Sequence, residues 1–193
     1  MKKLLITGFD PFNGNTANPS WLAASALPDT VGSYMLQKMQ LPTVYGEAAN
    51  MVIAAAGEWE PDVILCLGLA GGRAAVTPER VGINIRSASI ADNGGRQFTD
   101  SPILPEGPAA YFSTLPVTAM AKAIRDAGFS GAVSNTAGTY VCNDVLYTLL
   151  HRFAGTGIRV GFIHVPYLPE QGEPNMVLAD MVGALQAAIL AMD

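Results

Sequence analysis

Short aliphatic runs alternate along the chain with longer helical patterns, and this alternation restricts the fold more than any other feature. The runs carry little polar alternation, as expected of strands covered on both faces, and lie at 4–7, 63–67, 131–134 and 159–164. Helical patterns lie at 21–27, 46–59, 117–127, 142–153 and 175–192. Asn18 and Pro19 supply a cap and a first helical position before the first of them. The order predicts an α/β fold.

We expect an open, twisted, mostly parallel sheet with helices on both faces. Further strands are expected at 33–41 and 81–86, at sheet edges where antiparallel pairing is permitted. A chain of 193 residues can build one sizeable core, and nothing divides it into two halves. The prediction is therefore a single domain over residues 1–193.

The charge content predicts association with further copies of the chain. Charged residues make up 14% of the sequence, against roughly 25% in an average soluble protein. Hydrophobic residues make up 50%, and the mean hydropathy is +0.28. A surface so poor in charge is expected to be partly buried in a homo-oligomer.

Several classes of partner are excluded by charge and composition. The net charge of −5 and the scattered basic residues argue against nucleic acid. The apolar run at the N-terminus is too short for a signal peptide, and the stretch 176–192 falls short of the roughly 20 residues that span a bilayer. Two histidines and two cysteines show no zinc-like spacing, so no metal is expected. The expected compartment is the cytoplasm, with both thiols reduced.

Cys142 is the best candidate for a nucleophile. A polar, glycine-containing turn leads into it and a helical pattern follows, which places its sulfur at a helix N-terminus. A thiol in that position tends towards the thiolate. The alternative is an inert buried thiol, which describes Cys66 well because it lies inside the run 63–67. The free N–H groups of the first helical turn, near Asn143 and Asp144, could stabilise an oxyanion.

His164 is the better of two candidate bases. It closes the run 159–164, and ligands bind at the carboxyl ends of parallel strands. A right-handed crossover from 131–134 through the helix at 142 would bring it to Cys142. His151 lies mid-helix, near neither a helix start nor a strand end. The alternative for His164 is a hydrogen-bonded core histidine.

The residue spacing leaves the carboxylate partner of the histidine open. Glu79 follows Pro78 and could fix the imidazole tautomer. Asp62, Asp92 and Asp144 could do the same, and a salt bridge to Arg80 or another basic group would equally explain Glu79.

Two glycine-containing loops remain. The segment 68–73 lacks both the G-x-G-x-x-G spacing and the Lys-Ser pair of phosphate-binding loops, so it is expected to be a strand-end turn where backbone approaches a ligand. The segment 87–115 is rich in Gly, Pro, Asp and Asn. It is expected either to dock over the active site or a neighbouring subunit, or to form an ordered surface loop.

Four ordered motifs make the chain resemble the pyroglutamyl peptidase I family, also called pyrrolidone-carboxylate peptidases. They are TGFDPF at 7–12 with NPS at 18–20, GLAGGR at 68–73 with TPER at 77–80, SNTAGTYVCN at 134–143, and IHVPYLPEQ at 163–171. The resemblance implies an α/β cysteine peptidase, commonly tetrameric and without a cofactor. Its substrates would be N-terminally pyroglutamylated peptides, from which it removes pyroglutamate. The family's catalytic residues fall on Cys142, His164 and Glu79.

The resemblance also implies a substrate pocket, with departures from the family. Its matching positions are Phe9, Phe12, Thr43, Ile90, Tyr140 and Val141. Many members carry glutamine where this chain has Leu69, and arginine where it has Ser89. That arginine is thought to assist the oxyanion site, a role that Arg86 or backbone N–H groups could take over here. These departures motivate an alternative, a homologue that binds pyroglutamyl peptides with weak or lost turnover. A nucleoside-phosphorylase-like enzyme on a related sheet is a further alternative without an evident phosphate site.

Overall fold

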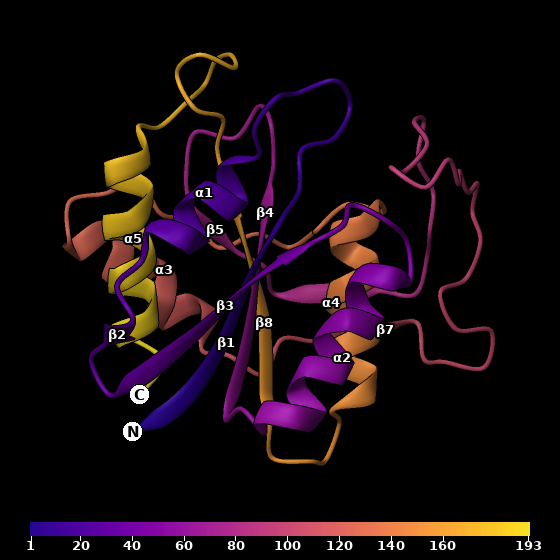
Figure 1. Ribbon diagram of the computed structural model, residues 1–193, viewed down its shortest axis with the longest axis horizontal. Coiled ribbons are helices and arrows are strands. Elements are labelled where there is room, and N and C mark those ends of the chain that lie inside the picture. Colours follow the sequence, from indigo (N-terminus) through magenta and orange to yellow (C-terminus); the bar gives the residue numbers. More distant parts are fainter.

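The computed structural model describes residues 1–193, and its centre is one twisted sheet (Figure 1). Its six strands lie in the order β2-β3-β1-β4-β8-β5. Their bounds are β1 (Lys2–Phe9), β2 (Thr30–Val31), β3 (Tyr34–Leu41), β4 (Val63–Leu69), β5 (Thr77–Pro78) and β8 (Arg159–Val165). The four inner strands are mutually parallel, and the short strands β2 and β5 are antiparallel to their neighbours at the two edges. The predicted sheet class is confirmed.

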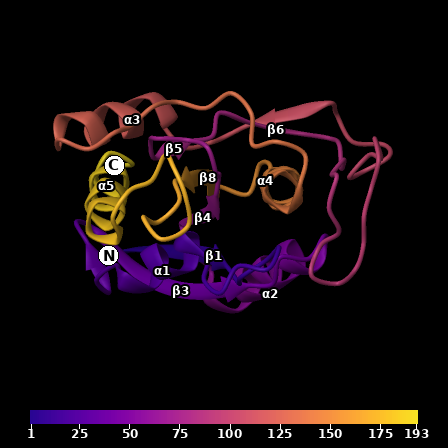
Figure 2. The ribbon, with the colours of Figure 1, turned by 90° about the horizontal axis from the view of Figure 1, so that it is seen from above.

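Helices cover both faces of this sheet. They are α1 (Pro19–Ala26), α2 (Glu47–Trp59), α3 (Val117–Asp126), α4 (Val141–Arg152) and α5 (Leu178–Leu190). Figures 1 and 2 show α1, α3 and α5 on one side of the sheet and α2 and α4 on the other. The Asn18 side chain accepts a hydrogen bond from the Ser20 N–H and caps α1, as predicted. None of the five helices is both long enough and apolar enough to cross a membrane.

Successive side chains of each inner strand point to opposite faces of the sheet and pack into two apolar cores, one on each face. In β1, Leu4 and Ile6 pack on the side of α1, α3 and α5, whereas Leu5 packs on the side of α2 and α4. All three are fully buried. Burial on both faces explains why these runs lack polar alternation, and each such side chain contributes roughly 1.5–3 kcal/mol of hydrophobic stabilisation.

The predicted strand at 131–134 is wrong, and Pro78 gives the reason. This segment runs parallel to 76–80 through isolated bridges, Val76 with Gly131 and Glu79 with Ser134. Ala132 N donates to Val76 O, and Ser134 N donates to Pro78 O. Pro78 has no N–H to donate back to this segment, so the ladder of hydrogen bonds is interrupted there. Because β5 is antiparallel to β8, the segment is also antiparallel to β8 and forms no parallel crossover with it.

Two further strands lie elsewhere than expected. Residues 81–86 contribute β6 (Val81–Ile83), which pairs antiparallel with β7 (Ala110–Phe112) in a separate small sheet rather than at an edge of the main one. Strand β3 confirms the prediction at 33–41, but it is an inner strand parallel to β1, and β2 occupies the edge beside it.

The start of the long loop is hydrogen-bonded to neighbouring segments. Ser87 N donates to Thr139 O at 3.0 Å, and the Asp92 carboxylate accepts from Tyr45 N at 2.9 Å. Tyr140 Oη donates to Ala91 O at 3.0 Å. In Figure 1 the loop then projects beyond α2 and α4, away from the sheet, before it returns in β7 (Ala110–Phe112). Residues 87–93 therefore form an ordered segment beside the turn that precedes α4.

Candidate active site

Helix α4 begins beside the carboxyl ends of β4 and β8. Cys142 is its second residue, after a turn in which Gly138 adopts a φ of 74°, in the left-handed region that favours glycine. The N–H groups of Cys142 and Asn143 donate to no other residue, as is usual in a first helical turn. The buried Asn143 side chain accepts from Ile83 N at 2.9 Å and donates to Ile83 O and Ile85 O. Asn143 thereby fixes the start of α4 against β6.

The sulfur of Cys142 rests on the backbone of β4. A Cβ atom at Gly68 would lie 2.8 Å from both Cys142 Sγ and the Phe162 ring, too close for either contact. Gly68 pairs with His164 in the sheet register. The absence of a side chain at Gly68 therefore leaves the space that the nucleophile occupies next to the histidine.

His164 forms a buried pair with Glu79. Its Nδ1 lies 2.7 Å from Glu79 Oε1, and the two side chains are 4% and 0% exposed. The Glu79 backbone is held by a hydrogen bond from its N–H to Phe162 O, one strand away. With Nδ1 donating to the carboxylate, Nε2 is left as the acceptor of a proton.

The other three candidate carboxylates are bound elsewhere. Asp62 accepts from Lys3 N at 2.6 Å, and Asp92 accepts from the backbone of Tyr45, Gly94 and Arg96. Asp144 binds Arg86 and the Gly46 N–H. Arg86 is thus held by a carboxylate and does not line the cavity described below, contrary to the role in the oxyanion site considered for it.

Arg73 forms a salt bridge to the buried Glu79 carboxylate. Arg73 Nη1 lies 2.6 Å from Glu79 Oε1 and 2.8 Å from Thr77 Oγ1, while Nη2 donates to Thr136 O at 2.8 Å. Glu79 therefore has both the histidine and a salt bridge as partners. Arg80 instead donates to Asn135 Oδ1. In the sequence Arg73 is visible only as the end of the glycine-containing turn, and no role was predicted for it.

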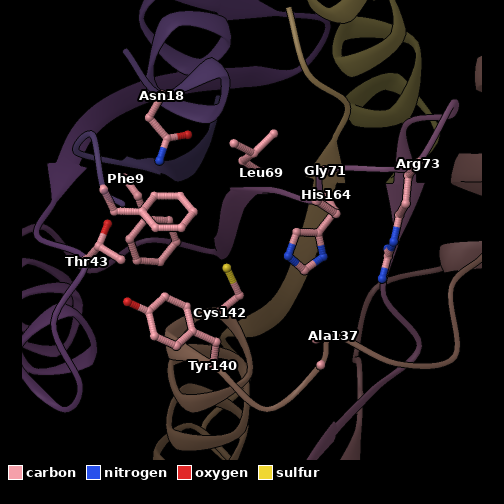
Figure 3. A pocket seen from close by; sticks show the side chains of 13 residues that line it. Phe9, Asn18, Thr43, Leu69, Gly71, Arg73, Ala137, Tyr140, Cys142 and His164 are labelled. Atoms are coloured by element: carbon pink, nitrogen blue, oxygen red, sulfur yellow. The ribbon is translucent and has the colours of Figure 1, made fainter. Parts of the chain in front are cut away.

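A cavity of about 260 Å³ opens in front of Cys142 and His164 (Figure 3). In the figure the sulfur points into the space between the aromatic rings and the imidazole, and Arg73 lies on the far side of His164 from those rings. The lining residues are Phe9, Phe12, Asn18, Thr43, Leu69, Ala70, Gly71, Arg73, Ala137, Gly138, Tyr140, Cys142 and His164. Four expected pocket residues, Phe9, Phe12, Thr43 and Tyr140, are among them.

Two expected pocket residues do not reach the cavity wall. The Val141 side chain is fully buried in the core on the α2 and α4 side, because it starts the inward face of α4. Ile90 is 36% exposed on the long loop. Among the lining residues that were not predicted for the pocket, Asn18 is visible in the sequence as a helix cap and in the NPS motif, and its Nδ2 also donates to Asp10 O.

The surroundings of Cys142 favour the thiol over the thiolate that its place at a helix N-terminus would favour. Burial and, secondarily, the charge of Glu79 raise the pKa of Cys142 to about 12, although Arg73 and the Cys142 N–H act in the opposite direction. No hydrogen bond joins Cys142 to His164. These surroundings favour the protonated thiol at rest.

The histidine is poised as a neutral base. Burial lowers the pKa of His164, opposed by its hydrogen bond and charge interaction with Glu79. Burial would raise the pKa of Glu79, but the interactions with His164, Ser134 and Arg73 bring it below its usual value. At neutral pH the site therefore contains a thiol, a neutral imidazole and an ionised carboxylate, an arrangement suited to general-base activation of the thiol.

Comparisons with known proteins agree along the whole chain. Residues 2–193 match the family described as pyroglutamyl peptidase. A pyrrolidone-carboxylate peptidase of Levilactobacillus brevis is 49% identical, over 98% of this chain and 97% of the relative. The crystal structure of Bacillus amyloliquefaciens pyroglutamyl peptidase I superposes with a TM-score of 0.96 at 41% identity, covering 100% of this chain and 97% of that one. Pyrrolidone carboxyl peptidase from Thermococcus litoralis gives 0.95 at 36% identity, covering 100% and 93%. The chain therefore belongs to the pyroglutamyl peptidase family.

Proposed function

We propose that Cys142, His164 and Glu79 are the catalytic residues of a cysteine exopeptidase. The enzyme removes N-terminal pyroglutamate from peptides. The observation that carries the assignment is the shared cavity of Cys142 and His164, with Glu79 hydrogen-bonded to the far side of the imidazole. No cofactor takes part in the proposed reaction.

The reaction proceeds through a thioester. Cys142 Sγ attacks the pyroglutamyl carbonyl carbon while His164 Nε2 takes the thiol proton. The free N–H groups at the start of α4 stabilise the oxyanion that forms. The tetrahedral intermediate collapses as the imidazolium gives its proton to the leaving amine, and the C–N bond breaks. Water, deprotonated by His164, then attacks the thioester, which releases pyroglutamate and returns the proton to Cys142.

The aromatic end of the cavity suits an uncharged lactam ring. Phe9, Phe12 and Tyr140 supply apolar faces, and Thr43 lies beside them. The Thr43 hydroxyl is already committed to Asp10 Oδ1 at 2.7 Å. A charged N-terminal ammonium group would lose its hydration there without gaining an ionic partner.

We also propose a cytoplasmic homotetramer. The state of the thiols and the surface composition support this, because Cys66 and Cys142 are both free and large apolar side chains such as Phe112, Val177 and Leu190 are exposed. The resemblance to a commonly tetrameric family supports the number of subunits.

Hydrolysis of matched fluorogenic amides tests the function. The pyroglutamyl amide should be cleaved at least about 10²-fold faster, in kcat/KM, than the prolyl amide, which lacks the ring carbonyl and carries a charged amine, or the open-chain glutaminyl amide. Measurable binding of a pyroglutamyl peptide by calorimetry without any product would instead support the homologue that binds without turnover. Equal rates on all three amides would contradict the assignment of the pocket.

Replacing Gly68 by alanine should damage catalysis through the position of the sulfur. The new methyl group would lie 2.8 Å from both Cys142 Sγ and the Phe162 ring, so one of them must move. A displacement of about 1 Å costs on the order of 10²-fold in rate. Gly57→Ala is the matched control, since a Cβ there meets nothing within 4 Å. Steady-state kinetics of the two variants decide; an unchanged kcat in Gly68→Ala would show that the sulfur position is not critical.

A further inference from the structure

We propose that Arg73 is a positioning residue that holds the Glu79 carboxylate against His164 Nδ1 and keeps the imidazole neutral, ready to take the thiol proton. The inference rests on the proposed function of Cys142 and His164. It assigns a role to a residue that contacts neither reacting atom but binds the partner of the base.

The guanidinium joins two of the three segments that carry the catalytic residues, the one with Glu79 and the one that leads into Cys142. Arg73 lies in the turn between β4 and β5, and its two terminal nitrogens bind Thr77 of β5, the Glu79 carboxylate and the Thr136 carbonyl. Thr136 belongs to the turn that leads into Cys142. A planar guanidinium fixes such a set of acceptors more rigidly than an ammonium group does. Arg73 thus ties the carboxylate to the turn that carries the nucleophile.

The hydrogen bonds of the carboxylate show why a cation is needed beside the neutral imidazole. Glu79 is fully buried; its Oε1 is shared by His164 and Arg73, and its Oε2 has no hydrogen-bond partner. A buried carboxylate must be compensated by a neighbouring positive charge. Without Arg73, the remaining group able to supply that charge is His164, which would do so by binding a proton. A protonated His164 cannot accept the proton of Cys142.

The groups that face His164 agree with this account. They are Glu79 after β5, Arg73 in the β4–β5 turn, and the Cys142 thiol on α4, which lines the same cavity. Glu79 favours the imidazolium, whereas the positive charge of Arg73 lowers the pKa of His164. Arg73 also lowers the pKa of Glu79 and of Cys142. One guanidinium therefore favours the ionised carboxylate, the neutral base and the developing thiolate.

A direct titration of the imidazole tests the proposal without relying on activity. The chain has only two histidines, so NMR signals of ¹⁵N-labelled imidazoles are assigned with one variant, His151→Gln. His151 lies on the exposed face of α4 and serves as the internal reference. In Arg73→Gln the pKa of His164 should rise by about one unit. In Arg80→Gln, the matched loss of a charge beside Glu79 in sequence, the pKa of His164 should stay unchanged, because Arg80 binds Asn135 outside the cavity.

Kinetics on the pyroglutamyl amide give the second readout. In the wild type the acidic limb of kcat/KM should lie below pH 6.5, the ordinary value of a histidine, because the pKa of His164 is lowered. Arg73→Gln should move this limb upward by about one pH unit and reduce kcat by about 10- to 100-fold with little change in KM. Arg73→Lys keeps the positive charge but loses the planar guanidinium that binds several acceptors at once. It should therefore return the acidic limb of kcat/KM to its wild-type pH but recover only part of kcat.

The outcomes separate the proposal from the proposed function. An Arg73→Gln protein that folds, as shown by its thermal transition, but leaves the His164 titration unchanged overturns the proposal, whatever the enzyme does. A loss confined to KM would also overturn it, since that result assigns Arg73 to substrate binding. Failure of the wild type to cleave the amide, with the His164 shift still present, would refute the peptidase assignment and leave the electrostatic role intact.

Discussion

Replacing Cys142 by serine is expected to reduce kcat on a pyroglutamyl amide by about 10⁴-fold or more, in the range found when a nucleophile is removed from a catalytic triad. Serine is close to cysteine in size, so the first turn of α4 and its contacts with β4 should persist. Its hydroxyl is a far weaker nucleophile, and in this site it would face a neutral His164 across a cavity in which even the thiol stays protonated at rest.

Cys66 provides the matched control for this experiment. It is 1% exposed inside β4, and burial raises its pKa to about 12, so it is an inert core thiol. Cys66→Ala should retain kcat and lose about 1 kcal/mol of folding stability from the small cavity left behind. Mass spectrometry after partial alkylation of the wild type should find the modification on Cys142, in proportion to the activity lost. Turnover by Cys142→Ser close to that of the wild type, with normal thermal unfolding, would refute the thioester mechanism.

Local patterns were enough to predict most of the helices and strands. They also singled out Cys142 at the start of α4 and His164 near the end of β8. The buried strands β1, β4 and β8 show their burial directly in composition, and the turn before Cys142 marks the start of α4. The failure at 131–134 has a different origin. Its own residues suit a strand, but the ladder is broken by Pro78 on the partner segment, which is more than fifty residues away in sequence.

The remaining features of the site depend on tertiary contacts that spacing does not report. The pairing of Glu79 with His164 requires β5 to lie against β8, and only the family resemblance, not the spacing, had singled out Glu79. The raised pKa of Cys142 follows from desolvation at the cavity wall and from the charge of Glu79, and neither is visible in the local sequence. Arg73 was missed because a guanidinium at the end of a glycine-containing turn does not indicate which carboxylate it will bind.

Loss of the Asp144 carboxylate is expected to destabilise the fold more than any change in the cavity. Asp144 is fully buried in the first turn of α4; its Oδ1 lies 2.6 Å from both Nε and Nη2 of Arg86, and its Oδ2 accepts from Gly46 N at 2.8 Å. The Arg86 guanidinium also lies over the rings of Tyr45 and Phe98. Asp144→Ala would leave a mostly buried cation unpaired, so the free energy of unfolding should fall by about 3–5 kcal/mol, measured by urea denaturation.

A double-mutant cycle separates the ion pair from its surroundings. If the cost of each single variant arises from the charge left behind, Asp144→Ala combined with Arg86→Ala should cost about 2–3 kcal/mol less than the sum of the two singles. Asp126→Ala is the matched control, because Asp126 pairs with Lys122 in the open, 61% exposed, and its loss should cost less than about 1 kcal/mol. All variants need the same protomer concentration, since association would add to stability. Strict additivity of the two single variants would mean that the stabilisation comes from the Gly46 hydrogen bond and the aromatic contacts of Arg86 rather than from the ion pair.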